Sequence, residues 1–168
     1  ISSGATPKTA EKEKIYSDSD NGIPFLRVQN LLPTGELDYS ECKFINKKTH
    51  ENYLRRSQVS EGDLLVKITG VGRMAVASVA PDGFIGNTNQ HMVVIKTRNK
   101  EVSKVLASYL NSDIGEKLAS RRATGGTRPA LDYPALLSIP IVYDKRILEI
   151  NQDAIARKDE KLLEAKSL

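Results

Sequence analysis

The chain has 168 residues, with 25 Lys and Arg against 21 Asp and Glu, which gives a formal net charge of +4. This length suits one domain with a hydrophobic core, and a content of 39% hydrophobic and 27% charged residues excludes wholesale disorder. The single cysteine excludes an internal disulfide, and no apolar run approaches the ~18–20 residues that span a bilayer, so we expect a cytoplasmic protein without membrane contact.

Short apolar runs between turn residues predict a series of β-strands. The first twenty or so residues are polar and punctuated by Ser, Gly and Pro, so we expect a loop there that does not resemble a signal peptide. A strand is expected at 23–28, with one or two more within 37–45. Runs rich in Val and Ile predict further strands at 64–68, 74–79 and 91–95.

The apolar spacing becomes helical after residue 100. It predicts a helix over 103–118 with Ser103 as its N-cap, and Gly115 is expected to break or bend it. Strands followed by helices indicate an α+β fold, with the domain at 1–142 and a final helix at 143–168. The final helix has balanced charges and a seven-residue apolar repeat, which indicates pairing with another helix, and packing of this helix on its own domain stays open as the alternative. The repeat consists of Leu148, Ile155 and Leu162.

The chain has only one cysteine and two histidines, which limits nucleophilic catalysis. Cys42 has no glycine-rich elbow or helix start beside it, so a structural thiol is favoured over a nucleophile. Glu41 and Lys43 form a Glu-x-Lys step, with Asp20 upstream, which keeps a metal-dependent nuclease open as an alternative. Gly70-Val71-Gly72 lacks the third glycine of a dinucleotide loop. We therefore assign no catalytic residue, metal ligand or cofactor to this chain.

Basic and amide side chains gather in loops, a pattern typical of nucleic-acid binding and equally of solvated surface charge, and both interpretations stay open on spacing alone. Arginine suits guanine and phosphate, whereas Asn and Gln suit adenine. Only 3 Phe, 6 Tyr and no Trp are present, which favours duplex DNA over stacking on single strands. Asp63 is expected to order the turn at Gly62 rather than touch DNA. The predicted DNA-binding residues are Lys67, Thr69, Arg73, Asn87, Asn89, Gln90, Arg121, Arg122, Thr127 and Arg128.

Segments spread over nearly the whole chain resemble, in the same order, the target recognition domains of type I restriction–modification specificity subunits. Residues 3–7 and 22–31 resemble the opening of such a domain. Residues 62–72 resemble its central strand and glycine turn, and residues 124–131 with 137–141 resemble the segment that closes it.

The resemblance implies a twisted β-rich domain with flanking helices, followed by a spacer helix. Such a domain reads one half of a bipartite duplex DNA site and performs no chemistry. Its implied partners are adenine-N6 methyltransferase subunits, which carry S-adenosylmethionine, a restriction/translocase subunit, and a second recognition domain held through antiparallel spacer helices. Because a whole specificity subunit has two such domains and this sequence lacks an initial Met, we expect a piece of a longer chain.

The segment 140–146 departs from the family pattern. It has one proline, Pro140, and lacks the Glu-Gln step that usually leads into the spacer helix. A second context therefore stays open, in which the domain lies at the C-terminus of a fused adenine methyltransferase. A third class, a protein-interaction module that works only through its final helix, also stays open.

Overall fold

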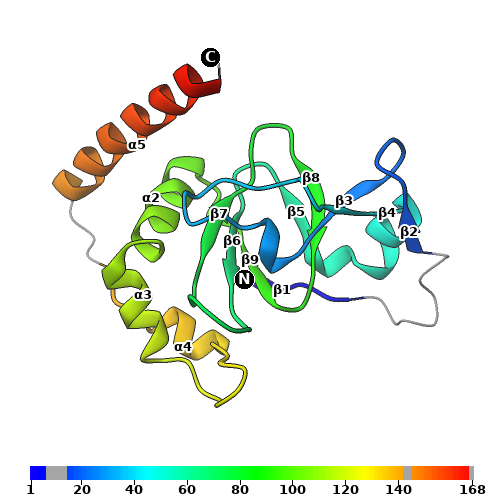
Figure 1. The fold of residues 1–168 in the computed structure, drawn as a ribbon, viewed down its shortest axis with the longest axis horizontal. Helices are drawn as coiled ribbons and strands as arrows, with labels where there is room; N and C mark the ends of the chain where they lie inside the picture. Colours follow the sequence, from blue (N-terminus) through cyan, green and yellow to red (C-terminus); the bar gives the residue numbers. More distant parts are fainter. Residues whose placement is uncertain (7–14, 142–144, 167–168) are drawn as a thin grey trace.

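The computed structural model describes residues 1–6, 15–141 and 145–166, which form two β-sheets and a group of helices (Figure 1). The first sheet has the strand order β1–β9–β6–β7 and is antiparallel throughout. The second has the order β2–β4–β3–β8–β5, in which only β3 and β8 run parallel. The fold is thus a mixture of α and β structure, as the sequence predicts.

The strands are short. Those of the first sheet are β1 (Ser2–Ser3), β6 (Leu64–Lys67), β7 (Ala77–Val79) and β9 (Met92–Ile95). Those of the second sheet are β2 (Tyr16–Ser17), β3 (Ile23–Leu26), β4 (Lys43–Ile45), β5 (Gln58–Ser60) and β8 (Ile85–Thr88).

The first sheet lies between the helices and the second sheet because both of its faces are apolar. Side chains alternate across a strand, so successive residues of β6 enter different cores. Leu64 and Val66 belong to the core shared with the helices, whereas Leu65 belongs to the core shared with the second sheet. In β9, Val93 likewise faces the helices and Val94 faces the second sheet.

Two consecutive helices, α2 (Lys100–Leu110) and α3 (Asp113–Ser120), replace the single helix predicted over 103–118. The predicted N-cap was wrong: Asn99 caps α2, and Ser103 is buried inside the helix. The break comes at Ser112, whose side chain caps α3 by accepting from Gly115 N at 3.1 Å. Gly115 does not break the helix, and a Cβ there would lie 2.2 Å from the carbonyl oxygen of Tyr109.

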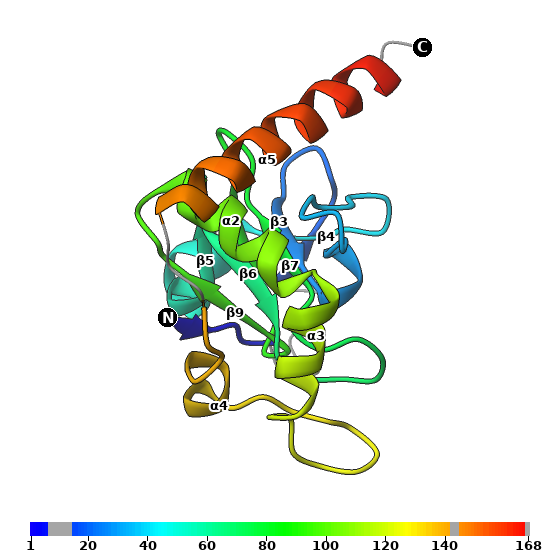
Figure 2. The ribbon, with the colours of Figure 1, turned by 90° about the vertical axis from the view of Figure 1, so that its left-hand side faces the viewer.

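The remaining helical segments are shorter, except the last. They are the 3₁₀ turns η2 (Val28–Asn30) and η4 (Arg55–Ser57), the π turn η3 (Thr49–Tyr53), α4 (Tyr133–Leu137) and α5 (Lys145–Lys166). Helix α5 passes over α2 and extends beyond the body of the domain (Figure 2). No helix among the described residues has the length and apolar character needed to cross a membrane.

Candidate nucleic-acid interface

Two loops that are far apart in the sequence meet at the C-terminal end of β6. The first is the turn 69–73 after β6, and the second is the hairpin 124–130, closed by mutual hydrogen bonds between Thr124 and Ala130 of 2.9 and 2.8 Å. Gly70 N donates to Pro129 O at 3.1 Å, and Thr69 bridges Ala130. Both loops lie at the lower end of the domain in Figure 1, and α5 lies at the upper end. The predicted glycine turn and the closing segment therefore form one surface.

Glycines give these loops backbone conformations that side chains rarely adopt. Gly70 and Gly72 in the turn have φ of +123° and +81°, and Gly125 in the hairpin has φ of +98°. The backbone N–H groups from Gly125 to Arg128 donate no hydrogen bond within the described part of the chain. The hairpin therefore offers these donors to an external acceptor such as a phosphate.

The cations of the hairpin region differ in how firmly they are held. Arg121, Thr127 and Arg128 are exposed, and neither arginine has a side-chain partner among the described residues. Arg122 is half-buried, because its Nε donates to Ser138 Oγ and its Nη1 to Leu118 O, both at 2.9 Å. The predicted residues thus lie just after α3 or in the hairpin, and Arg122 serves partly to hold the end of α3.

Lys67 lies beneath the turn rather than on its surface. The residue is only 9% exposed, and its Nζ donates to Val71 O at 2.7 Å. Burial lowers the pKa of Lys67, because the ammonium loses contact with water. Lys67 was predicted to bind DNA, and the structure instead shows its ammonium occupied in holding the turn.

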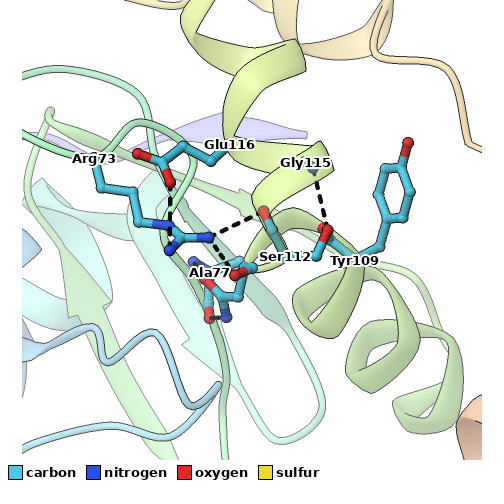
Figure 3. Close-up of polar contacts among 7 residues, drawn as sticks. Arg73, Ala77, Tyr109, Ser112, Gly115 and Glu116 are labelled. Carbon is cyan, nitrogen blue, oxygen red and sulfur yellow. Dashed lines mark hydrogen bonds and ion pairs between the residues drawn. The ribbon is translucent and has the colours of Figure 1, made fainter.

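Arg73, at the end of the same turn, points toward the helices (Figure 3). Its Nη2 donates to the carbonyl oxygens of Asn111 and Ser112, where α2 ends, the second at 3.0 Å. Its Nη1 lies 3.5 Å from a Glu116 carboxylate oxygen in α3. Arg73 was predicted to bind DNA, and the structure instead shows its guanidinium joining the turn to the junction between α2 and α3.

Asn87 is in the core, which corrects its predicted position in an exposed loop. It belongs to β8 and has no exposed surface. Its Nδ2 donates to Leu54 O at 2.8 Å and to Ser57 Oγ at 3.1 Å. Its Oδ1 lies 2.5 Å from His50 Nδ1, so this ring nitrogen carries the proton in the arrangement that satisfies all partners.

The connection between β8 and β9 approaches the same end of the first sheet, since Ile68 N donates to His91 O at 3.0 Å. Asn89, also predicted to bind DNA, lies in this connection but is buried, and its Oδ1 accepts from His91 N. Gln90 is exposed and accepts a hydrogen bond from Thr6. Gly4 packs closely here, because a Cβ would lie 1.9 Å from Asn89 O.

The turn before β6 confirms the expectation for Asp63. Its Oδ2 accepts from Ser60 N at 2.8 Å and from Lys96 Nζ at 2.7 Å. Gly62 has φ of +75° and donates its N–H to Ala80 O at 2.9 Å. Asp63 therefore orders the turn at Gly62.

Cys42 and the step formed by Glu41 and Lys43 were the residues considered for nucleophilic or metal-dependent chemistry. Cys42 is half-buried, and desolvation raises the pKa of its thiol, which opposes the thiolate form. Glu41 and Lys43 are exposed, and no group of three or more His, Cys, Asp or Glu residues among those described could hold a metal ion.

The final helix exposes apolar side chains to solvent. Ile150 and Leu163 are 67% and 70% exposed. The side chains of the predicted seam, Leu148, Ile155 and Leu162, lie outside the described part of the structure.

Val71 was not among the predicted site residues. It occupies the middle of the turn 69–73 and is 75% exposed. Its only sequence signal is its position between two glycines, which predicts an unusual backbone but not the direction of the side chain.

Comparison with known proteins does not assign a family. No protein-family model matches the sequence. The (2S)-3-sulfopropanediol dehydratase activating enzyme of Klebsiella oxytoca is 22% identical over 142 residues, which cover 84% of this chain and 41% of that protein. The chain thus spans about two fifths of the length of this relative. A match at this identity does not define the activity of the present chain.

Proposed function

We propose that this chain is a non-catalytic DNA recognition domain that reads one half of a bipartite duplex site. It would act in the cytoplasm as part of a type I restriction–modification system and position adenine-N6 methyltransferase and restriction subunits. The proposal rests on one observation: the turn 69–73 and the hairpin 124–130 form a single surface with exposed Arg121 and Arg128 and free backbone N–H groups. Arginine and backbone donors are the groups that contact phosphates, and arginine also reads guanine.

The position of α5 supports the proposed binding of partner subunits and of a second recognition domain. A helix of 22 residues is about 33 Å long, and α5 begins beside α2 and extends away from the domain (Figure 2). Ile150 and Leu163 are exposed on α5, so the domain leaves these apolar side chains uncovered. A second recognition domain bound through antiparallel helices would place two reading surfaces at a defined separation. A fused methyltransferase would use the same surface in a different chain context.

Removal of the exposed arginines tests the function. The full chain and an Arg121→Ala/Arg128→Ala variant are titrated with a randomised duplex pool at several salt concentrations. Each phosphate contact contributes about 0.9 to the slope of log affinity against log salt, so we expect the slope to fall by about 2 if both bind phosphate. If Arg128 reads a guanine instead, its loss costs about 1–3 kcal/mol and relaxes preference at one base.

A matched control removes two charges elsewhere. Lys47 and Lys48 are exposed just before η3, on the β4 side of the domain, and Lys47→Ala/Lys48→Ala changes the net charge by the same amount. We expect this variant to keep the affinity and salt slope of the unmodified chain within error. Unchanged binding in the arginine variant would contradict the proposed surface. Cleavage of plasmid DNA with Mg²⁺ that is abolished by Glu41→Ala would favour the nuclease alternative.

A further inference from the structure

Val71 has the largest exposed fraction among the large apolar side chains that are exposed in the described part of the chain. It is 75% exposed at the middle of the turn 69–73. Single exposed apolar residues are common in proteins, so exposure alone assigns no role. For Val71, exposure is combined with a fixed backbone, because hydrogen bonds from other segments hold its turn.

Three contacts hold the turn. Lys67 Nζ donates to the carbonyl oxygen of Val71 itself at 2.7 Å, from beneath the turn. Gly70 N is bonded to Pro129 O in the hairpin at 3.1 Å. Arg73 donates to the carbonyls of Asn111 and Ser112, which connect α2 to α3. A turn anchored in this way loses little further conformational entropy when it binds a partner.

The side chain of Val71 limits what it can recognise. It has no donor or acceptor, so it cannot read the polar edges of the bases. The apolar group that base pairs present in the major groove is the 5-methyl group of thymine. The neighbouring hairpin supplies exposed Arg128 and free N–H groups, which suit the flanking phosphates.

We propose that Val71 is a specificity-determining residue that packs against the 5-methyl group of a thymine in the major groove. This inference rests on the proposed function and adds a base and a residue to it. Lys67 acts as a positioning residue, because its ammonium holds the carbonyl of Val71 and leaves the valine side chain free. The two glycines beside Val71 allow the backbone to present that side chain outward.

The test begins with selection of duplexes from a randomised pool by the full chain. In the enriched duplex, each thymine is then replaced in turn by deoxyuridine, which removes only the 5-methyl group. At one thymine we expect the unmodified chain to lose about 3–5-fold in affinity, the effect of one buried methyl group. Val71→Ala is expected to bind the thymine duplex 3–5-fold more weakly and to be insensitive to deoxyuridine at that position.

Two further variants separate a specific contact from a general loss of apolar surface. Ile85→Ala shortens another exposed apolar side chain, 59% exposed at the start of β8, and is expected to keep the full response to deoxyuridine. Val71→Ile keeps an apolar β-branched side chain and is expected to retain that response. The melting temperature of each variant is measured to verify folding. We expect it to be unchanged, because the substituted side chains are exposed.

The outcomes distinguish the inference from the function on which it rests. A response to deoxyuridine at one position that disappears in Val71→Ala supports the contact. Equal losses in both proteins at every thymine, no loss at any, or an enriched duplex without thymine would overturn the inference and leave sequence-specific binding in place. Failure of the pool to yield any enriched sequence would overturn the proposed function itself.

Discussion

Replacement of Arg73 by Met separates a positioning role from contact with DNA. The guanidinium donates two charge-assisted hydrogen bonds to the carbonyls of Asn111 and Ser112, worth about 1.5–2 kcal/mol each at a half-buried site. The pair with Glu116 is half-exposed and adds at most about 1 kcal/mol. Against this, Met removes the buried Arg73 Nε, which has no hydrogen-bond partner in the described structure, and this recovers about 1–2 kcal/mol.

The net expectation for Arg73→Met is a loss of about 2 kcal/mol in the free energy of unfolding. For a domain of this size, that corresponds to a melting temperature lower by about 4–8 °C. Calorimetry measures the stability, and DNA titration at several salt concentrations measures the binding. A residue that only positions the turn weakens affinity without a change in salt slope, because no phosphate contact is lost.

Glu116→Gln is the matched control for this experiment. It removes the ion pair but keeps both hydrogen bonds from Arg73 to Asn111 and Ser112, so we expect a loss of stability of at most about 1 kcal/mol relative to the unmodified chain. The reasoning would be refuted if Arg73→Met melted like the unmodified chain and its salt slope fell by about 1. Such a result would place the guanidinium on a phosphate.

Two further predictions concern polar residues beneath the surface. Asn87→Ala deletes the hydrogen bonds to Leu54, Ser57 and His50 in the core, so urea denaturation is expected to show a loss of about 2–4 kcal/mol in the free energy of unfolding. The DNA sequence preference of the folded protein is expected to stay unchanged. A relaxed preference at one base without loss of stability would contradict this prediction. Burial lowers the pKa of Lys67, so the unfolded chain binds more protons just below the ordinary lysine pKa of 10.5, and this residue's contribution to stability rises with pH there. Urea unfolding between pH 8 and 10.5 is expected to show a rise in the stability of the unmodified chain relative to Lys67→Met, and parallel pH profiles would contradict it.

The sequence predicted those strands whose signal is local. The Val- and Ile-rich runs at 64–68 and 91–95 form β6 and β9, because a continuous apolar run suits a strand buried on both faces. β8 was missed because its buried positions include Gly86 and Asn87, residues that favour loops. Asn87 is accepted in the core only because η4 and its neighbours supply partners for its amide, and sequence spacing does not reveal them.

The predicted site residues also divide into those marked by a local sequence signal and those whose position depends on tertiary contacts. Arg128 and Thr127 were placed on an exposed loop, and the structure has them there, because the neighbouring glycines and proline are strong local signals. Arg73 and Lys67 were assigned to the surface on the basis of charge. Their partners are backbone carbonyls, which every residue type provides, so no residue pattern marks them in advance. The roles of these two residues therefore depend on tertiary structure.

The proposed reading surface separates residues that hold its loops from residues that face outward. The anchors are largely backbone contacts, such as Gly70 with Pro129 and Thr124 with Ala130, and they impose little restriction on the exposed side chains. Exposed substitutions usually change stability by less than about 0.5 kcal/mol, so Val71, Thr127 and Arg128 can vary without unfolding the domain. Changes at Gly70 or Gly125 would instead strain the backbone, because both have positive φ. This arrangement would let one fold acquire different DNA specificities while the turn and the hairpin keep their geometry.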